Sequence, residues 1–263
     1  MALLLDVKSI SKSFGGLKAV SDASLSVDEG KIVSLIGPNG AGKTTLFAII
    51  SGFLGADSGR VFLNNENITG MKPHRICDKG MVRTFQITQP FASLSTLENI
   101  MVGAYKNTSL KAKAKQKATE VAELVGMTHL LNTEANSLTV AGRKRLELAR
   151  ALATDPKLLL LDEVMAGLNP SEIDEIVNII KIIRDSGVTI FLIEHVMKAV
   201  VNLSDYSYVL NDGVLIAHGT PKQIANDPLV IEAYLGQGAA KAMTKNTPTK
   251  AKASKTSKKG GKS

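Results

Sequence analysis

The feature that most constrains this chain of 263 residues is a glycine-rich stretch from Gly37 to Thr45, which reads G-P-N-G-A-G-K-T-T. The apolar run Ile32–Ile36 precedes it and a second apolar run, Leu46–Ile50, follows it. A strand, a glycine-rich loop and a helix in this order are the setting in which the pattern G-x-x-x-x-G-K-[ST] forms a phosphate-binding loop. The stretch therefore predicts an α/β domain that binds a nucleoside triphosphate.

The residue types of this loop suit an anionic ligand. Glycines let the backbone turn tightly, so that successive N–H groups point inward, and the following helix adds the positive end of its dipole. Lys43 supplies a cation for the β- and γ-phosphates, and the Thr44 hydroxyl can ligate Mg²⁺. We expect the nucleotide to be bound by Gly37, Pro38, Asn39, Gly40, Ala41, Gly42, Lys43, Thr44 and Thr45.

Composition excludes several other classes of protein. The apolar fraction of 44% is ordinary for a globular core, and the longest apolar runs are too short to cross a bilayer. The first residues run straight into a strand pattern, so we expect no cleaved leader. The single cysteine, Cys77, excludes an internal disulfide and fits a reducing compartment. These observations fit a protein of a reducing compartment whose chain does not cross a membrane.

The net charge of +8 is concentrated at one end of the chain. From Gly236 onward there are eight lysines and no acidic residue, and the rest of the chain holds as many basic as acidic residues. The body therefore has no charge excess that would favour nucleic acid as a partner. The composition of residues 239–263 predicts a disordered, Lys-rich tail.

The order of apolar and turn patterns predicts alternating strands and helices. Strands are expected over Leu3–Phe14, Lys18–Val27, Ile32–Ile36, Gly59–Leu63, Met81–Phe85, Lys157–Leu161, Thr189–Ile193, Tyr206–Leu210 and Val214–Ala217. Helices are expected over Pro73–Lys79, Thr96–Tyr105, Leu110–Val125, Gly142–Ala153, a segment from an N-capping Ser171 to Ser186, Lys222–Asn226 and Pro228–Leu235. Residues 1–88 and 157–238 then form a discontinuous catalytic core with a β subdomain, and residues 89–156 an all-helical subdomain.

Two carboxylates follow a second buried strand pattern, at Asp162 and Glu163 after Leu158–Leu161. Open α/β sheets bind ligands at the carboxyl edge of their strands. Asp162 can hold Mg²⁺, and Glu163 can accept a proton from an attacking water molecule. With Lys43 and Thr44, they cover the cation, metal and nucleophile-positioning roles that phosphoryl transfer requires.

Three further residues are candidates for the same site. His195 follows the Thr189–Ile193 strand and is placed to donate to a γ-phosphate, although a lone histidine is more often structural. Gln86 ends another strand and could contact Mg²⁺ or the attacking water. Phe14 could stack on a base, with packing in the core as the alternative.

In their order along the chain, these motifs resemble the ATPase subunits of ABC transporters, over about residues 3 to 237. Val82–Gln86, Arg145–Arg150 and Ile193–His195 are similar to the subunit that serves branched-chain amino acid importers, as are the closing segments Ala217–Pro221 and Ala233–Gly236. The implied fold is that of a P-loop NTPase, with a RecA-like core, an antiparallel β subdomain and an all-helical insertion.

The resemblance also implies a mechanism. Two subunits associate head to tail, and each of two ATP molecules lies between the phosphate-binding loop of one subunit and the signature segment of the other. By position, Phe14 stacks on adenine, Gln86 links the metal to the membrane partner, Glu163 activates water and His195 contacts the γ-phosphate. The remaining nucleotide contacts come from Thr139, Val140, Ala141, Gly142 and Asn169. The implied partners are a second ABC ATPase, permease subunits and, indirectly, a solute-binding protein.

Two positions depart from the family pattern. The signature segment is usually L-S-G-G-Q, whereas Leu138–Gly142 reads L-T-V-A-G, and the methyl group of Ala141 is expected to crowd the γ-phosphate contact. Val164 replaces a proline, which is expected to loosen the loop after Glu163.

Alternative functions remain open at this stage. A lipopolysaccharide-export ATPase shares similar motifs near its end, and an ABC ATPase that acts on DNA or ribosomes shares the fold. The latter is disfavoured because the chain has one phosphate-binding loop and no basic face. A small-molecule kinase is disfavoured because no site for an acceptor substrate is evident.

Overall fold

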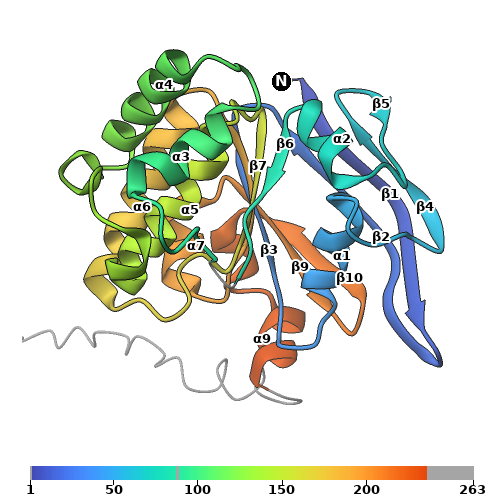
Figure 1. Cartoon of the computed structure of the whole chain (residues 1–263). Coiled ribbons are helices and arrows are strands. Elements are labelled where there is room, and N and C mark those ends of the chain that lie inside the picture. Colours follow the sequence, from blue (N-terminus) through green and yellow to red (C-terminus); the bar gives the residue numbers. More distant parts are fainter. Residues whose placement is uncertain (1, 87–88, 236–263) are drawn as a thin grey trace, which may run out of the picture.

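In a computed structural model of the chain, residues 2–86 and 89–235 are described, and the statements below refer to them. Two β-sheets and the helices packed around them make up the described part of the molecule (Figure 1). The predicted α/β architecture with an antiparallel β subdomain is confirmed: a mainly parallel sheet carries the phosphate-binding loop, and an antiparallel sheet packs beside it. The predicted Lys-rich tail lies outside the described residues.

The main sheet has six strands in the order β10, β9, β3, β8, β7, β6. They are β3 (Ile32–Ile36), β6 (Met81–Arg83), β7 (Leu158–Asp162), β8 (Thr189–Ile193), β9 (Tyr206–Asn211) and β10 (Val214–Gly219), with only β10 antiparallel to its neighbour. In β7, Leu158 and Leu160 pack on one side and Leu159 and Leu161 on the other. Continuous apolar runs form these strands because both faces of the sheet are covered.

One face of the main sheet is covered by a helix and the second sheet. That sheet consists of β1 (Leu3–Phe14), β2 (Leu17–Asp28), β4 (Ser58–Leu63) and β5 (Glu66–Asn67) in the order β2, β1, β4, β5. Helix α1 (Lys43–Ile50), which follows the phosphate-binding loop, lies between the two sheets (Figure 1) and buries Leu46, Phe47 and Ile50 there. The short α2 (Pro73–Asp78) leads into β6. This packing fixes the start of α1 relative to the sheet edge.

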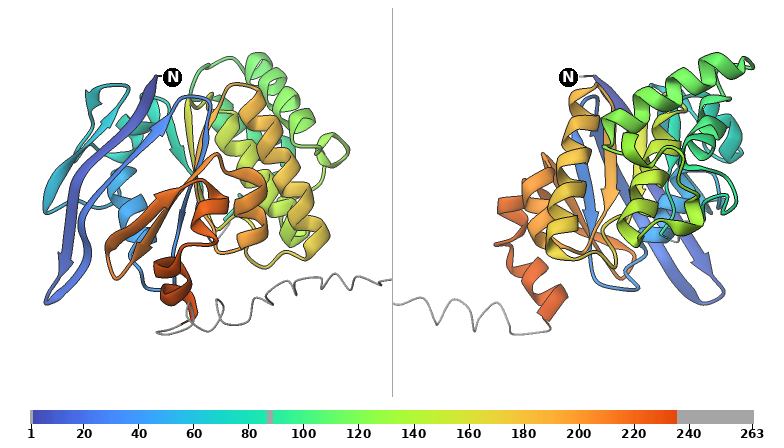
Figure 2. Two further views of the ribbon diagram at one scale, coloured as in Figure 1. Left: turned by 180° about the vertical axis from the view of Figure 1, so that it is seen from behind. Right: turned by 60° about the vertical axis from the view of Figure 1, so that its left-hand side comes forward.

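The opposite face is covered by a layer of helices (Figure 2). These are α3 (Thr96–Ala104), α4 (Lys111–Leu124), α5 (Val140–Leu152), α6 (Pro170–Asp185) and α7 (Met197–Leu203), with 3-10 turns at Thr128–Leu130 and Ala135–Ser137. Short helices α8 (Pro221–Ile224) and α9 (Pro228–Leu235) pack beside β9 and β10. The described elements between residues 89 and 156 are helices, as expected, but the proposed domain boundaries stay a prediction.

Several predicted element boundaries are wrong for identifiable reasons. Helix α6 begins at Pro170 with Asn169, not Ser171, as its N-cap, and α5 begins two residues before Gly142 with Thr139 as its cap. Strand β6 ends at Arg83 rather than Phe85, because the Phe85 N–H donates to Glu147 instead of a neighbouring strand. Helix α7 was not predicted. Within the described part of the chain, no helix has the length and apolar character needed to cross a bilayer.

Candidate functional site

The phosphate-binding loop is held tightly against two neighbouring strands. Gly37 (φ 150°) and Gly42 (φ 98°) both adopt backbone conformations that disfavour other residues. A Cβ atom on Gly37 would lie 2.0 Å from the carbonyl oxygen of Leu210 in β9, and one on Gly42 would lie 2.2 Å from that of Ala19 in β2. The two glycines are therefore required by close backbone approach as well as by the turn.

The loop encloses the ammonium group of Lys43. Its Nζ donates to the carbonyl oxygens of Gly37 at 2.8 Å and Pro38 at 2.9 Å, and the residue is buried. Burial lowers the pKa of Lys43, and the carboxylates of Glu163 and Asp162 oppose that shift. The cation is thus placed inside the loop, with acidic groups of β7 beside it.

A cavity of about 400 Å³ opens beside this loop. It is lined by Phe14, Leu17, Lys18, Ala19, Asn39, Gly40, Ala41, Gly42, Lys43, Thr44, Thr45, Glu163, Asp212 and Gly213. Phe14 is 49% exposed, so packing in the core is excluded, and Lys12 lies against its ring. The structure thus places the predicted base-stacking ring, most of the phosphate-binding loop and the predicted catalytic carboxylate around one space.

The backbone at Glu163 is constrained on both sides. Glu163 adopts φ 48°, an uncommon conformation for a residue with a side chain, and its N–H donates to the Ile193 carbonyl at 3.0 Å. Gln86 Nε2 donates to Glu163 Oε2 at 2.7 Å. Gln86, predicted to contact Mg²⁺ or the attacking water, therefore lies beside Glu163 and holds one oxygen of its carboxylate, a pairing that the sequence did not indicate.

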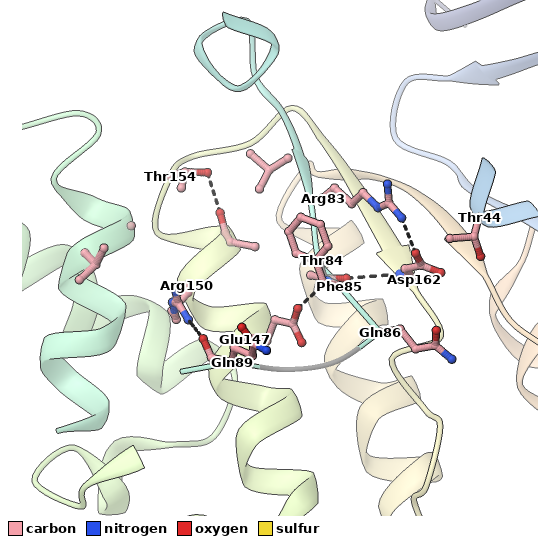
Figure 3. A pocket seen from close by; sticks show the side chains of 14 residues that line it. Thr44, Arg83, Thr84, Phe85, Gln86, Gln89, Glu147, Arg150, Thr154 and Asp162 are labelled. Atoms are coloured by element: carbon pink, nitrogen blue, oxygen red, sulfur yellow. Dashed lines mark hydrogen bonds and ion pairs between the residues drawn. The ribbon is translucent and has the colours of Figure 1, made fainter. Parts of the chain in front are cut away.

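A second cavity, of about 760 Å³, brings the predicted metal ligands together. Thr44, Gln86 and Asp162 all line it, and Figure 3 shows Thr44 beside Asp162. A hydroxyl, an amide oxygen and a carboxylate are the hard oxygen donors that Mg²⁺ prefers, so these residues fit the ion.

The Asp162 carboxylate has a partner that the sequence pattern did not indicate. Arg83, the last residue of β6, donates from Nη2 to Asp162 Oδ2 at 2.7 Å (Figure 3), and both side chains are almost completely buried. The sequence did offer one signal of this ion pair, because Arg83 is a basic residue at the end of a predicted strand. It was missed because strand order is not visible in the sequence: β6 and β7 are neighbours only in the folded sheet.

Two further buried charged residues were also missed. Lys144 of α5 donates from Nζ to the Gln86 carbonyl at 2.8 Å, which ties the residue that contacts Glu163 to the helical layer. Glu194 follows β8 and accepts the Met165 N–H at Oε1, at 3.0 Å, while its Oε2 is buried without a hydrogen-bond partner. Burial raises the pKa of Glu194 to about 7, against the opposing hydrogen bonds from the Met165 and His195 N–H groups.

The other predicted nucleotide contacts lie elsewhere on the chain. Thr139 and Val140 are exposed at the start of α5, Asn169 at the start of α6, and His195 after β8. Neither these four residues nor Ala141 and Gly142 are among the described residues that line the two cavities. One chain therefore does not bring the signature segment and the phosphate-binding loop together.

The two departures from the family pattern have local explanations. Ala141 is only 7% exposed, whereas Thr139 beside it is exposed; the expected crowding of the γ-phosphate by the Ala141 methyl group stays a prediction. Val164 and Met165 are both buried in the core under the helical layer, and the Met165 N–H is bonded to Glu194. The loop after Glu163 is therefore anchored without the proline.

Sequence comparisons agree with this geometry. The family described as ABC transporter matches residues 20–166, and the family described as branched-chain amino acid ATP-binding cassette transporter matches residues 214–240. The high-affinity branched-chain amino acid transport ATP-binding protein BraF of Pseudomonas aeruginosa is 41% identical over 250 residues, covering 89% of this chain and 98% of BraF. LivG of Escherichia coli, with the same description, is 40% identical over the same shares of both chains.

Solved structures resemble this one closely. The crystal structure of an ATP-binding cassette of an ABC transporter in its ADP conformation has a TM-score of 0.83 and 35% identity, and the match covers 90% of this chain and 100% of that one. The crystal structure of a nucleotide-free ATP-binding cassette from an ABC transporter has a TM-score of 0.82 and 34% identity. That match covers 89% of this chain and 100% of the other. Since relatives of this identity match over nearly their whole length, the chain belongs to the ABC-transporter ATPases, in the family of the branched-chain amino acid transport ATP-binding proteins.

Proposed function

We propose that this chain binds and hydrolyses ATP as the energy-supplying subunit of an importer for branched-chain or related small amino acids. The single observation that carries the ATPase assignment is the cavity lined at once by the phosphate-binding loop and by Glu163. Such a cavity brings phosphate-binding groups and a candidate base to one ligand. The transported solute is inferred from the family, because solute selectivity resides in other proteins of a transporter.

Within this proposal each residue has a distinct role. The backbone of Gly37–Thr45 binds the phosphates, Lys43 neutralises their charge, and the exposed ring of Phe14 stacks on the base. Glu163, with one oxygen held by Gln86, accepts a proton from the attacking water.

Magnesium completes the proposed site. Thr44, Gln86 and Asp162 would hold it, and the bound ion would neutralise charge on the phosphate oxygens. His195 would donate to the γ-phosphate. Because its side chain is exposed at the same sheet edge, it is available to a nucleotide there.

The remaining contacts are proposed to come from a second ATPase subunit, identical or closely related. Thr139–Gly142 and Asn169 begin α5 and α6, and helix N-termini bind anions through free N–H groups. Permease subunits at the cytoplasmic face of the membrane are the further partners, and a solute-binding protein acts indirectly. We propose no nucleic-acid partner.

Replacing Glu163 by Gln tests the ATPase assignment. The amide keeps the size of the side chain but cannot accept the proton, so turnover should fall by at least about 10²-fold while ATP binding persists. Phosphate release and equilibrium binding of a fluorescent ATP analogue measure the two effects. Glu123→Gln, at an exposed position of α4, is the matched control. Hydrolysis at the normal rate in Glu163→Gln would show that another group is the base.

The solute assignment needs the partner proteins. The chain should co-purify with permease subunits, and ATP-driven uptake of labelled leucine into vesicles should require Glu163. Uptake of unrelated solutes but not amino acids, or co-purification with lipopolysaccharide-export proteins, would contradict the assignment.

A further inference from the structure

The buried pair of Arg83 and Asp162 joins a cation of the protein to a residue proposed to ligand Mg²⁺. Asp162 is 2% exposed, and Arg83 Nη2 lies 2.7 Å from its Oδ2. The Asp162 N–H and carboxylate belong to the strand end beside Thr44, as Figure 3 shows. Within the described residues, this carboxylate has no other ion-pair partner.

The Arg83 guanidinium is enclosed mainly by aromatic rings. Its central carbon lies 5.4 Å from the ring centre of Phe85, 5.9 Å from that of Phe53 and 6.0 Å from that of Phe47. Nη1 donates to the Ser51 hydroxyl at 3.2 Å, and Nε is buried without a hydrogen-bond partner. Cation–π contacts hold the charge in place, but they leave the hydrogen bonding of the guanidinium incomplete.

This arrangement has an electrostatic consequence. A buried carboxylate without a counter-ion is costly, and Arg83 supplies that counter-ion while the metal is absent. When a divalent cation approaches the same carboxylate, the two positive charges repel each other in a poorly screened environment. Arg83 is the partner with incomplete hydrogen bonds, so moving its guanidinium costs less free energy than moving the Asp162 carboxylate.

We propose that Arg83 is a positioning residue that neutralises Asp162 in the metal-free protein and competes with Mg²⁺ for it when nucleotide binds. This inference rests on the proposed function, because it takes Asp162 as a ligand of the metal. Arg83 then sets how strongly ATP binding depends on Mg²⁺. It also connects that dependence to Phe53 and Phe85, whose rings are about half exposed on the outer side of the guanidinium.

The test measures the factor by which Mg²⁺ tightens ATP binding, as the Kd in EDTA divided by the Kd in excess Mg²⁺. A fluorescent ATP analogue and the non-hydrolysing Glu163→Gln protein are used. Adding Arg83→Gln should raise this factor at least about fivefold, because a positive charge next to the metal ligand is removed. An unchanged or smaller factor would overturn the proposal and would make Arg83 a fixed support of Asp162.

Controls separate this inference from the proposed metal site. Asp162→Asn should abolish most of the Mg²⁺ effect; if it does not, the proposed metal site itself is wrong. Arg184→Gln removes one positive charge from the exposed end of α6 and should leave the factor unchanged. An equal rise in Arg184→Gln and Arg83→Gln would mean that only net charge matters, and would also overturn the proposal.

A second variant covers the case in which Arg83→Gln does not fold. Phe53→Leu removes one ring beside the guanidinium but leaves the ion pair with Asp162 intact. Because Arg83 is then held less firmly, Phe53→Leu should also raise the factor by which Mg²⁺ tightens ATP binding. An unchanged or smaller factor counts against the proposal. In addition, the side-chain NMR signal of Arg83 should shift when Mg²⁺ and ATP are added together and not with ATP alone; a signal insensitive to Mg²⁺ would contradict competition.

Discussion

At the scale of single residues, Glu194 is the buried group with the clearest dependence on pH. It is 0% exposed, and its neighbours include one acidic and one basic side chain, Glu163 and Lys144. Its pKa is raised from 4.5 to about 7, mainly because burial penalises the charged form. Its Oε1 accepts the Met165 N–H and so holds the loop that follows Glu163.

The raised pKa predicts how stability changes with pH. The folded protein binds the Glu194 proton more tightly than the unfolded chain does. The contribution of Glu194 to the free energy of unfolding is therefore fully present below pH 4.5 and is lost as the pH rises through about 7. Glu194→Gln resembles the protonated form and should raise the free energy of unfolding at pH 8 by about 3 kcal/mol. At pH 5 the difference should be small, and urea unfolding at both values measures it.

Two comparisons make this prediction specific. Glu123→Gln, at an exposed carboxylate of α4, should not change the dependence of stability on pH. Glu194→Ala removes the acceptor of the Met165 N–H and should destabilise the protein at both pH values. If Glu194→Gln is less stable than the natural protein at pH 8, the fold favours the charged form of Glu194, and the upward shift of its pKa is wrong.

At the scale of elements, the start of α6 is fixed by a reciprocal pair of hydrogen bonds. Asn169 Oδ1 accepts the Glu172 N–H at 3.1 Å, and Glu172 Oε2 accepts the Asn169 N–H at 2.9 Å. Pro170 occupies the first helical position, where a missing N–H costs nothing. Ser171, the cap expected from the sequence, lies inside the first turn and donates its own N–H and hydroxyl to Asn169.

Replacing Asn169, the cap in the structure, should therefore reduce stability more than replacing Ser171, the cap expected from the sequence. Asn169→Ala should lower the free energy of unfolding by about 1 kcal/mol, since it leaves N–H groups of the first turn without an acceptor. Ser171→Ala should cost less than half of that. Chemical denaturation without nucleotide measures both, and an equal or larger loss in Ser171→Ala would contradict the assignment of the cap.

The same comparison shows how far local patterns can predict elements. Asn169 and Ser171 are both good capping residues, and Pro170 between them is compatible with either choice. The capping preferences of these residues left the start of α6 uncertain by two residues. In the structure, Glu172 forms the reciprocal hydrogen bonds with Asn169 and so identifies Asn169 as the cap. Likewise, the strand beginning at Met81 was predicted but its end at Arg83 was not, because the Phe85 N–H is satisfied by Glu147, a residue more than sixty positions away.

At the scale of the whole molecule, the residues predicted to bind the nucleotide lie on separate surfaces of the chain. The phosphate-binding loop, Phe14 and Glu163 share one cavity, whereas Thr139 and Asn169 are exposed elsewhere. A second subunit that supplies these residues would complete the contacts to the γ-phosphate.

This division predicts association that depends on ATP. The Glu163→Gln protein, which retains bound ATP, should form a dimer with itself or with a related ATPase subunit, as measured by light scattering. Lys43→Ala, which lacks the cation of the phosphate-binding loop, should stay monomeric at the same ATP concentration. A single chain that binds and hydrolyses ATP at its full rate while remaining a monomer would contradict the proposal.

The sequence by itself determined the phosphate-binding loop, the strand that ends in Asp162 and Glu163, and the overall alternation of strands and helices. These features depend on residues that are adjacent or regularly spaced along the chain, so local geometry specifies them. Only the tertiary structure decided that Arg83 pairs with Asp162, that Lys144 binds the Gln86 carbonyl and that Glu194 supports the loop after Glu163. Each of these contacts joins elements brought together by the order of strands in the sheet or by helix packing, and the burial that makes them strong exists only after folding.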